Sequence, residues 1–473
     1  MKEASTVGPA VLADPAFRRR RTQNWLFLGL LYAFFYMTRY NYTAVNAQLA
    51  EVLGWSNTDL GVFETVMPLV YGLSVFLNGP LADRIGGKRA FLFGALGVFA
   101  MNFAFGACLL LVSKPAAWGL DAGRHRVVLE AARISGGLSP HGLLTTMATL
   151  WGINGYFQSF GALAIVKVNA QWFHVRERGG FSAIFGILIR LGLILAFSGA
   201  PLLSAHLGLR WAFWVPGASV GVLFLLNWRF MADAPEDVGF AALDTGDEPA
   251  HAEGAEAHAG LVEVIKKVFA SRAAWTIAFS SMMIGFVRRS VVDAWYPKYF
   301  VETYAVPKSA LGSFAPYQLA AWGIAICGIA GGFAFGLSSD RIYRGRRAPV
   351  ITYGFLGMAV VLAAFGVVHR LHLGPWAAAA CLMVLSFFVN GSHGMVGGAA
   401  SMDFGGRRAA ATAAGLFDGM QYLAGAFVGM GVGKLLDHWG WSWWMWAPIP
   451  FAIVGAATIS TLWNVTPDRR SAH

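Results

Sequence analysis

The chain has 473 residues, of which 56% are hydrophobic and only 13% are charged, and its formal net charge is +11. Soluble domains carry about a quarter charged residues, so this chain cannot cover a water-exposed surface of its size. Disorder is excluded as well, because it needs low hydrophobicity and high charge. The apolar residues form long continuous blocks, which favours spanning helices over an alternating β-barrel. The composition therefore predicts a polytopic, all-α membrane protein.

About twelve apolar blocks have the length of a membrane-spanning helix. They are expected at residues 24–47, 60–80, 90–112, 142–168, 182–205, 211–231, 274–300, 315–336, 349–369, 375–396, 409–432 and 444–465. An even number of spans places both termini on one side of the membrane. About 22 Lys and Arg residues fall on that side and about 9 on the other, which predicts cytoplasmic termini in an inner (plasma) membrane. The net positive charge then needs no nucleic-acid partner, and a monomer is expected.

A polar stretch divides the spans six and six. Residues 232–260 are acidic and rich in Ala and Gly, which is typical of a flexible linker. The basic, amphipathic LVEVIKKVF that follows suits a helix on the membrane surface. A second polar stretch, 113–140, is expected to be an external loop with a short helix near residues 126–133. The predicted organisation is a tail (1–23), a six-helix bundle (24–231), a linker with its amphipathic helix (232–272), a second six-helix bundle (273–465) and a tail (466–473).

The two halves repeat a loop motif. GPLADRIGGKR at 79–89 follows the second span, and GLSSDR at 336–341, with a basic pair at 346–347, follows the eighth. In both copies Gly permits a turn or a close helix approach, and Asp with Arg can form a charge network that holds one conformation. We expect these residues to act in gating rather than in substrate binding: Gly79, Asp83, Arg84, Arg89, Gly336, Asp340 and Arg341. The glycine runs at 328–336 and 425–433 are interpreted as close-packing seams.

This loop motif resembles the signature of the major facilitator superfamily, and twelve spans split six and six fit the fold of that superfamily along the whole chain. The resemblance implies two pseudo-symmetric six-helix bundles and transport by alternating access.

Several cations lie inside predicted spans, where an ionisable side chain costs about 2.5–3.5 kcal/mol. Arg39 and Arg288 hold equivalent places in spans 1 and 7, and Lys167, Arg190 and Arg289 are further candidates. Two guanidiniums that face one cavity repel each other unless an anion separates them. A phosphate monoester suits this role, because its charge is near −2 and its oxygens accept bidentate bonds from Arg.

The flanking residues narrow the resemblance. Five motifs resemble those of the organophosphate:phosphate antiporters: YAFFYMTRYN at 32–41, QSFG at 158–161, ERGG at 177–180, RRAAATAAG at 407–415 and DHWGW at 437–441. That family includes bacterial glycerol-3-phosphate and hexose-phosphate transporters. Arg288, followed by Asp293, resembles their seventh span with about one inserted residue. The resemblance implies that Arg39 and Arg288 bind the phosphoryl group and that Tyr32, Tyr36 and Tyr422 line the cavity.

The chain also departs from the glycerol-phosphate members. Tyr40 and Val75 stand where those members carry Lys, and Gln171 stands where they carry His. Lys167 matches a basic family position, whereas Arg190 falls at a neutral one, so one cavity cation has a candidate replacement in span 5. Loss of the His removes a group that could titrate near neutral pH.

Two further polar residues are candidates for the cavity: His393 and Asp418. The predicted substrate-binding set is therefore Arg39, Arg288, Tyr32, Tyr36, Lys167, Gln171, Arg190, Tyr422, His393 and Asp418. The sequence contains no HExxH, phosphate-loop or catalytic-triad pattern, so we expect no enzymatic site, metal or cofactor.

The sequence thus predicts a secondary transporter that exchanges an organic phosphate ester for inorganic phosphate. Two alternatives stay open at this point. One is a membrane sensor of sugar phosphate, because the family contains such sensors. The other is a proton-coupled transporter of an organic anion, which needs an intramembrane carboxylate such as Asp293 or Asp418.

Overall fold

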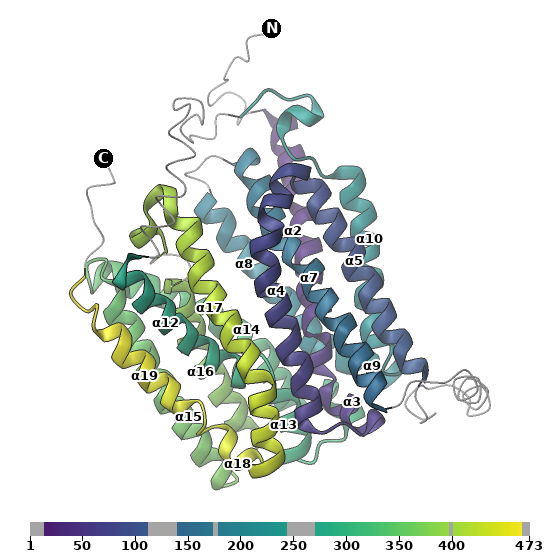
Figure 1. The fold of residues 1–473 in the computed structure, drawn as a ribbon, viewed down its shortest axis with the longest axis vertical. Helices are drawn as coiled ribbons and strands as arrows, with labels where there is room; N and C mark the ends of the chain where they lie inside the picture. The colour runs from purple at the N-terminus through teal and green to yellow at the C-terminus, as the bar shows by residue number, and fades with distance from the viewer. Residues whose placement is uncertain (1–13, 112–139, 174–177, 244–269, 397–400, 466–473) are drawn as a thin grey trace. The chain divides into compact units, whose positions relative to one another are not determined.

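The computed structural model describes residues 14–111, 140–173, 178–243, 270–396 and 401–465 (Figure 1). The described residues fall into two compact units. The first holds those up to Leu53 and from Val70 to residue 243, and the second holds Gly54–Leu69 and those from residue 270 onward. The predicted external helix near 126–133 and the amphipathic helix after residue 260 lie outside the described residues.

The first unit consists of helices joined by short turns. In chain order these are α2 (Pro15–Ala44), α3 (Asn46–Leu53), the second half of α4 (Asn57–Ile85), α5 (Gly87–Cys108), the 3₁₀ turn η1 (Leu109–Leu111), α7 (Pro140–Trp172), α8 (Arg178–Ile194), the π-helical turn η3 (Leu195–Gly199), α9 (Ala200–Leu207), α10 (Trp211–Phe230) and the 3₁₀ turn η4 (Pro235–Val238).

The second unit begins with the first half of α4, so this helix is divided between the two units. It continues with α12 (Arg272–Val287), the π-helical turn η5 (Arg288–Val292), α13 (Tyr296–Thr303), the 3₁₀ helix η6 (Lys308–Ser313), α14 (Ala315–Arg341), α15 (Arg347–Arg370), α16 (Pro375–Gly394), α17 (Ser401–Trp439), α18 (Trp441–Trp444) and α19 (Ile449–Ser460).

Each predicted span falls on a helix or on consecutive helical segments, which confirms the all-α membrane fold. Spans 5, 7 and 12 each combine two or three of the segments given above, and spans 1 and 3 pass near their ends into α3 and η1. Within the described residues, seven helical segments are by themselves long and apolar enough to cross a membrane: Gly87–Cys108, Gly186–Leu207, Trp211–Phe230, Ala315–Arg341, Arg347–Arg370, Pro375–Gly394 and Trp441–Ser460.

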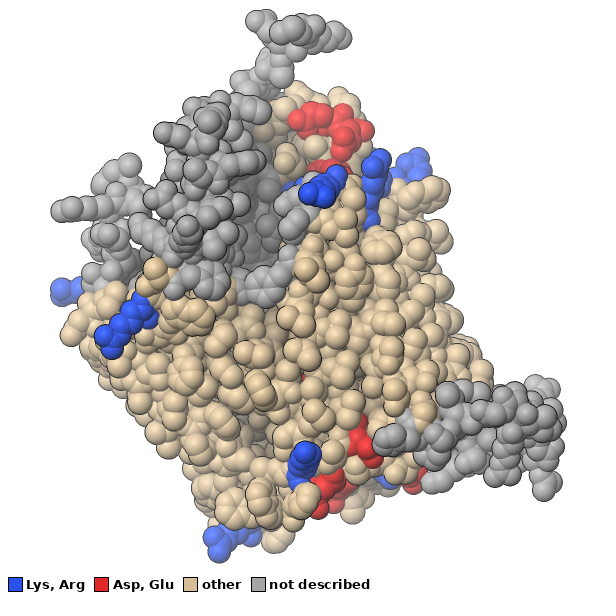
Figure 2. Space-filling view, in the orientation of Figure 1, with Lys and Arg blue, Asp and Glu red and all other residues tan. Residues whose placement is uncertain are grey.

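The surface between the helix ends is apolar. In Figure 2 the visible Lys, Arg, Asp and Glu side chains lie near helix ends, and the surface between them is tan. Large apolar side chains are exposed along the helices, for example Leu77 (72%) on α4 and Val360 (69%) on α15. Such exposure would be unfavourable in water but is expected where the solvent is lipid.

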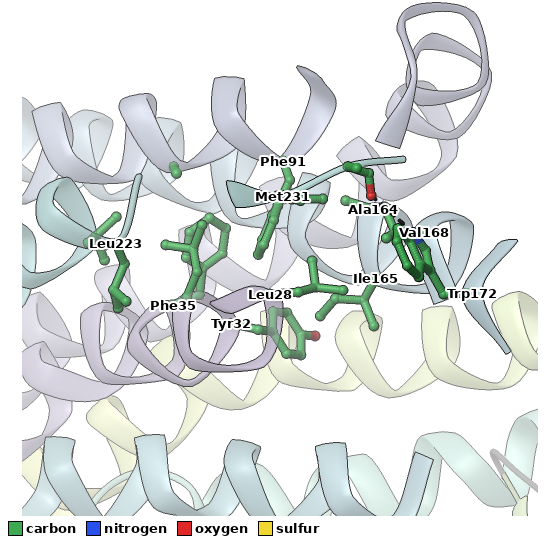
Figure 3. Packing of buried hydrophobic residues seen from close by; sticks show 14 of the residues in the cluster. Leu28, Tyr32, Phe35, Phe91, Ala164, Ile165, Val168, Trp172, Leu223 and Met231 are labelled. Carbon is green, nitrogen blue, oxygen red and sulfur yellow. Dashed lines mark hydrogen bonds between the residues drawn. The ribbon is translucent and has the colours of Figure 1, made fainter. Parts of the chain in front are cut away.

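The core of the first unit joins α2, α5, α7 and α10 (Figure 3). Its buried members include Tyr32, Phe35, Phe91, Val168 and Trp172. The indole of Trp172 donates a hydrogen bond of 3.2 Å to the carbonyl oxygen of Ala232. The side chain of Asn24 donates to the same carbonyl at 3.2 Å and accepts from the Ala232 backbone N–H at 2.7 Å. The chain that leaves α10 is therefore fixed to the core at residue 232.

The following residues also pack on the first unit. The ring of Phe240 meets the ring of Phe17 edge-on with centroids 5.5 Å apart, and Val238 and Leu243 join the same apolar cluster. Residues 232–243 lie within the stretch predicted as a flexible linker. Their apolar side chains, which the acidic composition concealed, make this part of the stretch a component of the first unit.

Candidate substrate-binding site

Arg39 lies in the interior of α2 with only 5% of its surface exposed. Its Nη2 donates a hydrogen bond of 3.3 Å to Oε1 of Gln158 on α7. Its guanidinium also lies over the rings of Tyr36 and Tyr71, at 4.8 and 4.4 Å from their centroids. These three neighbours are neutral, so they stabilise the cation without cancelling its charge. These contacts hold the guanidinium in place between α2, α4 and α7.

Gln158 in turn is held in place by α2. Its Nε2 donates to the carbonyl oxygen of Phe35 and to Oγ1 of Thr38, each at 3.1 Å. These two bonds fix the amide so that Oε1 faces Arg39. One turn further along α7, a Cβ at Gly161 would lie only 2.8 Å from the ring of Tyr32. The QSFG motif therefore combines a positioning amide with the space that a tyrosine ring needs.

The predicted tyrosines of α2 form one aromatic row. Tyr32 and Tyr36 meet edge-on with centroids 5.3 Å apart, and Tyr36 stacks on Tyr40 at 6.1 Å. Tyr71 of α4 was not predicted as a site residue. It precedes Val75 by one helical turn and therefore lies on the same face of α4. The resemblance to glycerol-phosphate transporters, which carry Lys at the position of Val75, could have indicated that this face lines the site.

Two predicted residues of α7, Lys167 and Gln171, lie further from Arg39. Lys167 donates from Nζ to the carbonyl oxygen of Ala82 at 3.1 Å, near the end of α4. Lys167 lies nine residues beyond Gln158, which is about 13 Å along α7. Gln171 lies about 20 Å from Gln158 along the same helix. Gln171 is exposed and Arg190 is half-buried on α8. The structure therefore brings Tyr36 and Gln158 to Arg39, but it does not bring Lys167 or Gln171 there.

In the second unit the arginines of span 7 sit on a π-helical turn. The N–H of Asp293 bonds the carbonyl of Arg288 at 2.9 Å, an i→i+5 bond that accommodates one extra residue. This agrees with the residue that the sequence appeared to insert. Nε of Arg288 lies 2.9 Å from Oδ2 of Asp293, and Nε of Arg289 lies 3.9 Å from the same oxygen. The wide turn thus lets both arginines reach one carboxylate.

Residues of α16 and α17 complete this cluster. Arg289 lies over the ring of Tyr422 at 5.8 Å, and Asp418 interacts electrostatically with Arg288. Oδ1 of Asp418 is buried and has no hydrogen-bond partner in the described part of the chain. Nδ1 of His393 lies 2.8 Å from Nε2 of Gln421, which also contacts Ser281. Four predicted site residues, namely Arg288, Tyr422, His393 and Asp418, therefore gather in this unit.

The second loop motif forms a charge network, but Asp340 pairs with Arg347 rather than with the adjacent Arg341. Oδ1 of Asp340 accepts a bond of 2.6 Å from Nη1 of Arg347, which also bonds Ser339, whereas Arg341 is exposed. Gly336 lies inside α14, and a Cβ there would meet nothing within 4 Å in the described part of the chain. Neither a turn nor a close approach is therefore seen at Gly336 among the described residues, and its part in gating stays a prediction. The turn is made nine residues later, by Gly345 at a φ of 85°.

In the first loop motif the turning residue is likewise a later glycine. Gly79 lies inside α4, the helix ends at Ile85, and Gly86 has a φ of 93°. The side chain of Asp83 lies outside the described residues, and Arg84 and Arg89 are exposed. Gly86, the first residue of the GG pair, thus makes the turn between α4 and α5, and Gly87 begins α5.

The first half of α4 packs closely on α17. A Cβ at Gly429 would lie 2.4 Å from Oγ1 of Thr65, and one at Gly433 would lie 2.4 Å from the carbonyl oxygen of Asn57, which confirms the 425–433 seam. At the helix start, Asp437 accepts from the backbone N–H groups of Asn57 and Thr58 at 3.0 and 2.8 Å and from the Thr58 hydroxyl at 2.6 Å. Burial raises the pKa of Asp437, but these hydrogen bonds outweigh it and hold the pKa below its usual value.

The sequence and fold match known transporters. The model of the Major Facilitator Superfamily matches residues 28–430, so the chain belongs to this superfamily of membrane transporters, which are not enzymes. A probable hexose phosphate transport protein of Chlamydia trachomatis is 25% identical over 98% of this chain and 96% of its own length. A glycerol-3-phosphate transporter of Bacillus subtilis is 28% identical over 97% and 96%.

Two further proteins, a membrane sensor and a transporter of known structure, are also similar to this chain. The membrane sensor protein UhpC of Escherichia coli is 26% identical over 91% of this chain and 89% of its own length. A solved bacterial homologue of the human lysosomal transporter Spinster shares the fold, with a TM-score of 0.69 at 14% identity over 93% of this chain and 96% of that one. The relatives agree with the organophosphate:phosphate antiporter family that the motifs of the sequence resemble.

Proposed function

We propose that this protein exchanges an organic phosphate ester, a glycerol or sugar phosphate, for inorganic phosphate across an inner membrane. The observation that carries the proposal is Arg39, a buried cation held by the amide of Gln158 and by tyrosine rings. A cation buried at membrane depth is costly, and such residues commonly mark the path or the binding site of a substrate. Relatives that transport hexose phosphate and glycerol-3-phosphate support the same ligand class.

The phosphoryl group is bound by Arg39 together with Arg288, which holds the equivalent place in the second six-helix half. Nε of Arg288 lies 2.9 Å from Oδ2 of Asp293. A phosphate dianion competes with this single carboxylate because it carries more charge and offers more acceptor oxygens. Binding at Arg288 therefore requires the anion to replace or to share the contact with Asp293.

Exchange follows from the charges. When the phosphate contacts both arginines, it offsets their mutual repulsion and favours closure around the substrate. Without an anion, the two cations oppose that closure, so the empty carrier does not return and an outgoing phosphate is required. Both termini are cytoplasmic in this proposal, as the distribution of Lys and Arg predicts.

The test is counterflow in proteoliposomes. The purified chain is reconstituted with internal unlabelled phosphate, and uptake of labelled phosphate is measured alone and against glycerol-3-phosphate, hexose 6-phosphates and non-phosphorylated sugars. We expect uptake only with internal phosphate, and inhibition only by phosphate esters. Uptake that ignores internal phosphate, or that a sugar without phosphate inhibits equally, would contradict the proposal.

A second candidate function is a membrane sensor of sugar phosphate, which the relative in Escherichia coli favours. The two functions differ in turnover. A sensor binds the phosphate ester, as measured by isothermal titration, but shows no counterflow under conditions in which a glycerol-3-phosphate transporter reconstituted in parallel is active.

Asp418 favours the proton-coupled alternative, because its Oδ1 is buried without a hydrogen-bond partner in the described chain. Proton coupling would appear as uptake driven by an inward pH gradient into vesicles that contain no phosphate, and it would be lost in Asp418→Asn.

A further inference from the structure

A basic cavity opens at the end of the first unit where α2 begins. It has a volume of about 740 Å³. Four cations line it: Arg20 of α2, Lys88 and Arg89 of α5, and Arg229 of α10; two carboxylates, Asp233 and Asp237, also line it. None of these residues belongs to the cluster around Arg39 or to the span-7 arginines.

Both carboxylates already hold backbone N–H groups. Oδ1 of Asp233 accepts from the N–H of Lys88 at 2.6 Å, at the start of α5. Oδ2 of Asp237 accepts from the N–H of Ala234 at 3.0 Å. The negative charge of the two carboxylates is therefore partly used by these backbone N–H groups. The four cations also outnumber the two carboxylates. The cavity keeps a net positive charge that suits an anionic ligand.

The cations are also close enough to oppose one another. Burial, followed by the charge of Arg229, lowers the pKa of Arg20. Burial lowers the pKa of Lys88, and Arg20 adds to this effect while Asp233 and Asp237 oppose it. Nη1 of Arg20 is buried and lacks a hydrogen-bond partner within the described residues. A donor of this kind needs an acceptor, which an anion would supply.

The membrane-facing surface beside the cavity is apolar. Val222, Leu225 and Trp228 recur every three residues on α10 and are exposed by 59%, 57% and 64%. Trp228 also lines the cavity, so the basic cavity and the apolar stripe are continuous. Arg20 stands four residues before the predicted first span, which places the cavity at the level of lipid headgroups.

We propose that this cavity binds the phosphate headgroup of an anionic phospholipid whose acyl chains lie along the Val222–Leu225–Trp228 stripe of α10. The phosphodiester accepts from Arg20 and Arg229, and the acyl chains cover the exposed side chains that a soluble phosphate would leave uncovered. This combination of charge and adjoining apolar surface favours a lipid over a free anion.

The test compares lipid binding by the full-length protein and its variants. Delipidated protein in detergent is titrated with phosphatidylglycerol or phosphatidylcholine, and bound lipids are counted by native mass spectrometry. Each basic side chain near a lipid surface strengthens binding of an anionic headgroup about fivefold, so the double variant Arg20→Gln/Arg229→Gln should bind phosphatidylglycerol about 30-fold more weakly. Binding of phosphatidylcholine should change little.

Two further variants serve as controls. Arg19→Gln/Arg272→Gln removes the same charge from exposed positions outside the cavity and should bind phosphatidylglycerol like the parent protein. Arg20→Lys/Arg229→Lys keeps the charge and should keep most of the binding, which excludes misfolding as the cause of the loss.

Three results would overturn the proposal. The first is equal binding of phosphatidylglycerol by the parent protein and the Gln double variant. The second is equal binding of the two lipids by the parent protein. The third is binding of inorganic phosphate that depends on Arg20 and Arg229 without any preference for anionic lipid.

Discussion

Replacing Gln158 with Glu separates two roles of Arg39, as an anion-binding group and as a structural one. In the structure Oε1 of Gln158 accepts from Nη2 of Arg39 at 3.3 Å, and the amide leaves the arginine charged. A glutamate at this position keeps the acceptor but adds a negative charge in direct contact with the guanidinium. The carboxylate then occupies the cation that we expect to bind phosphate.

The size of the effect follows from the bonds involved. A hydrogen bond to a charged group contributes about 1.5–3 kcal/mol, so loss of Arg39 as a partner should weaken phosphate binding about 10- to 150-fold. The fold should change little. The bonds that Nε2 donates to Phe35 and to Thr38 are lost at a cost of about 1 kcal/mol each, but the new ion pair offsets this loss.

The assay measures phosphate counterflow at a series of phosphate concentrations together with thermal unfolding. Gln158→Glu should unfold near the temperature of the parent protein but show a strongly raised KM for phosphate. Gln158→Leu serves as the matched control: it removes all three amide bonds and should lower the unfolding temperature, while Arg39 stays charged. Counterflow of Gln158→Glu at the KM of the parent protein would refute the role of Arg39 in phosphate binding.

Three further predictions follow from the same geometry. Arg39→Lys should abolish counterflow although the charge is kept, because Lys lacks the planar fork that bonds phosphate oxygens in pairs; near-normal uptake would exclude bidentate binding. Asp293→Asn should tighten phosphate binding, measured by isothermal titration, because it removes the carboxylate that lies 2.9 Å from Arg288; unchanged or weaker binding in a folded variant would contradict the competition. The pKa of Asp437 is lower in the folded than in the unfolded chain, so its stabilising effect is present above the unfolded pKa and is lost as the pH falls through the folded one. Denaturant unfolding between about pH 5 and pH 2 should therefore show a smaller loss of stability for Asp437→Asn than for the parent protein; equal slopes would contradict the role of its hydrogen bonds to Thr58.

Much of the fold could be predicted because long apolar blocks have only one stable arrangement in lipid. Many helix ends were predicted within a few residues, since charged residues mark where a chain leaves the membrane. The exceptions are α2, which begins nine residues before the predicted first span, and α17, which extends eight and seven residues beyond the predicted eleventh span. The packing role of residues 232–243 could not be predicted, because Phe240 and Leu243 are isolated apolar residues in an acidic stretch. The contact of Phe240 with Phe17 and the packing of Leu243 on the same cluster are visible only in three dimensions.

The candidate site was predicted in part. Buried arginines are conspicuous in an apolar sequence, so Arg39 and Arg288 could be selected directly. Gln158 and Tyr71 could not be assigned to Arg39, because both lie on other helices and polar or aromatic residues are common there. Lys167 was predicted as a site residue because of its charge, but its Nζ donates to the carbonyl oxygen of Ala82 near the end of α4.

The π-helical turn at Arg288–Val292 begins with two adjacent arginines, although the proposed binding of phosphate needs only one from span 7. An inserted residue rotates everything after it by about 100° relative to what precedes it, unless the helix absorbs the insertion locally. Here the wide turn absorbs it, and Asp293 stays within reach of both guanidiniums. A substitution at either arginine would therefore leave the other within reach of Asp293. Substrate preference could then diverge through single substitutions at either position, while the remaining arginine preserves the charge.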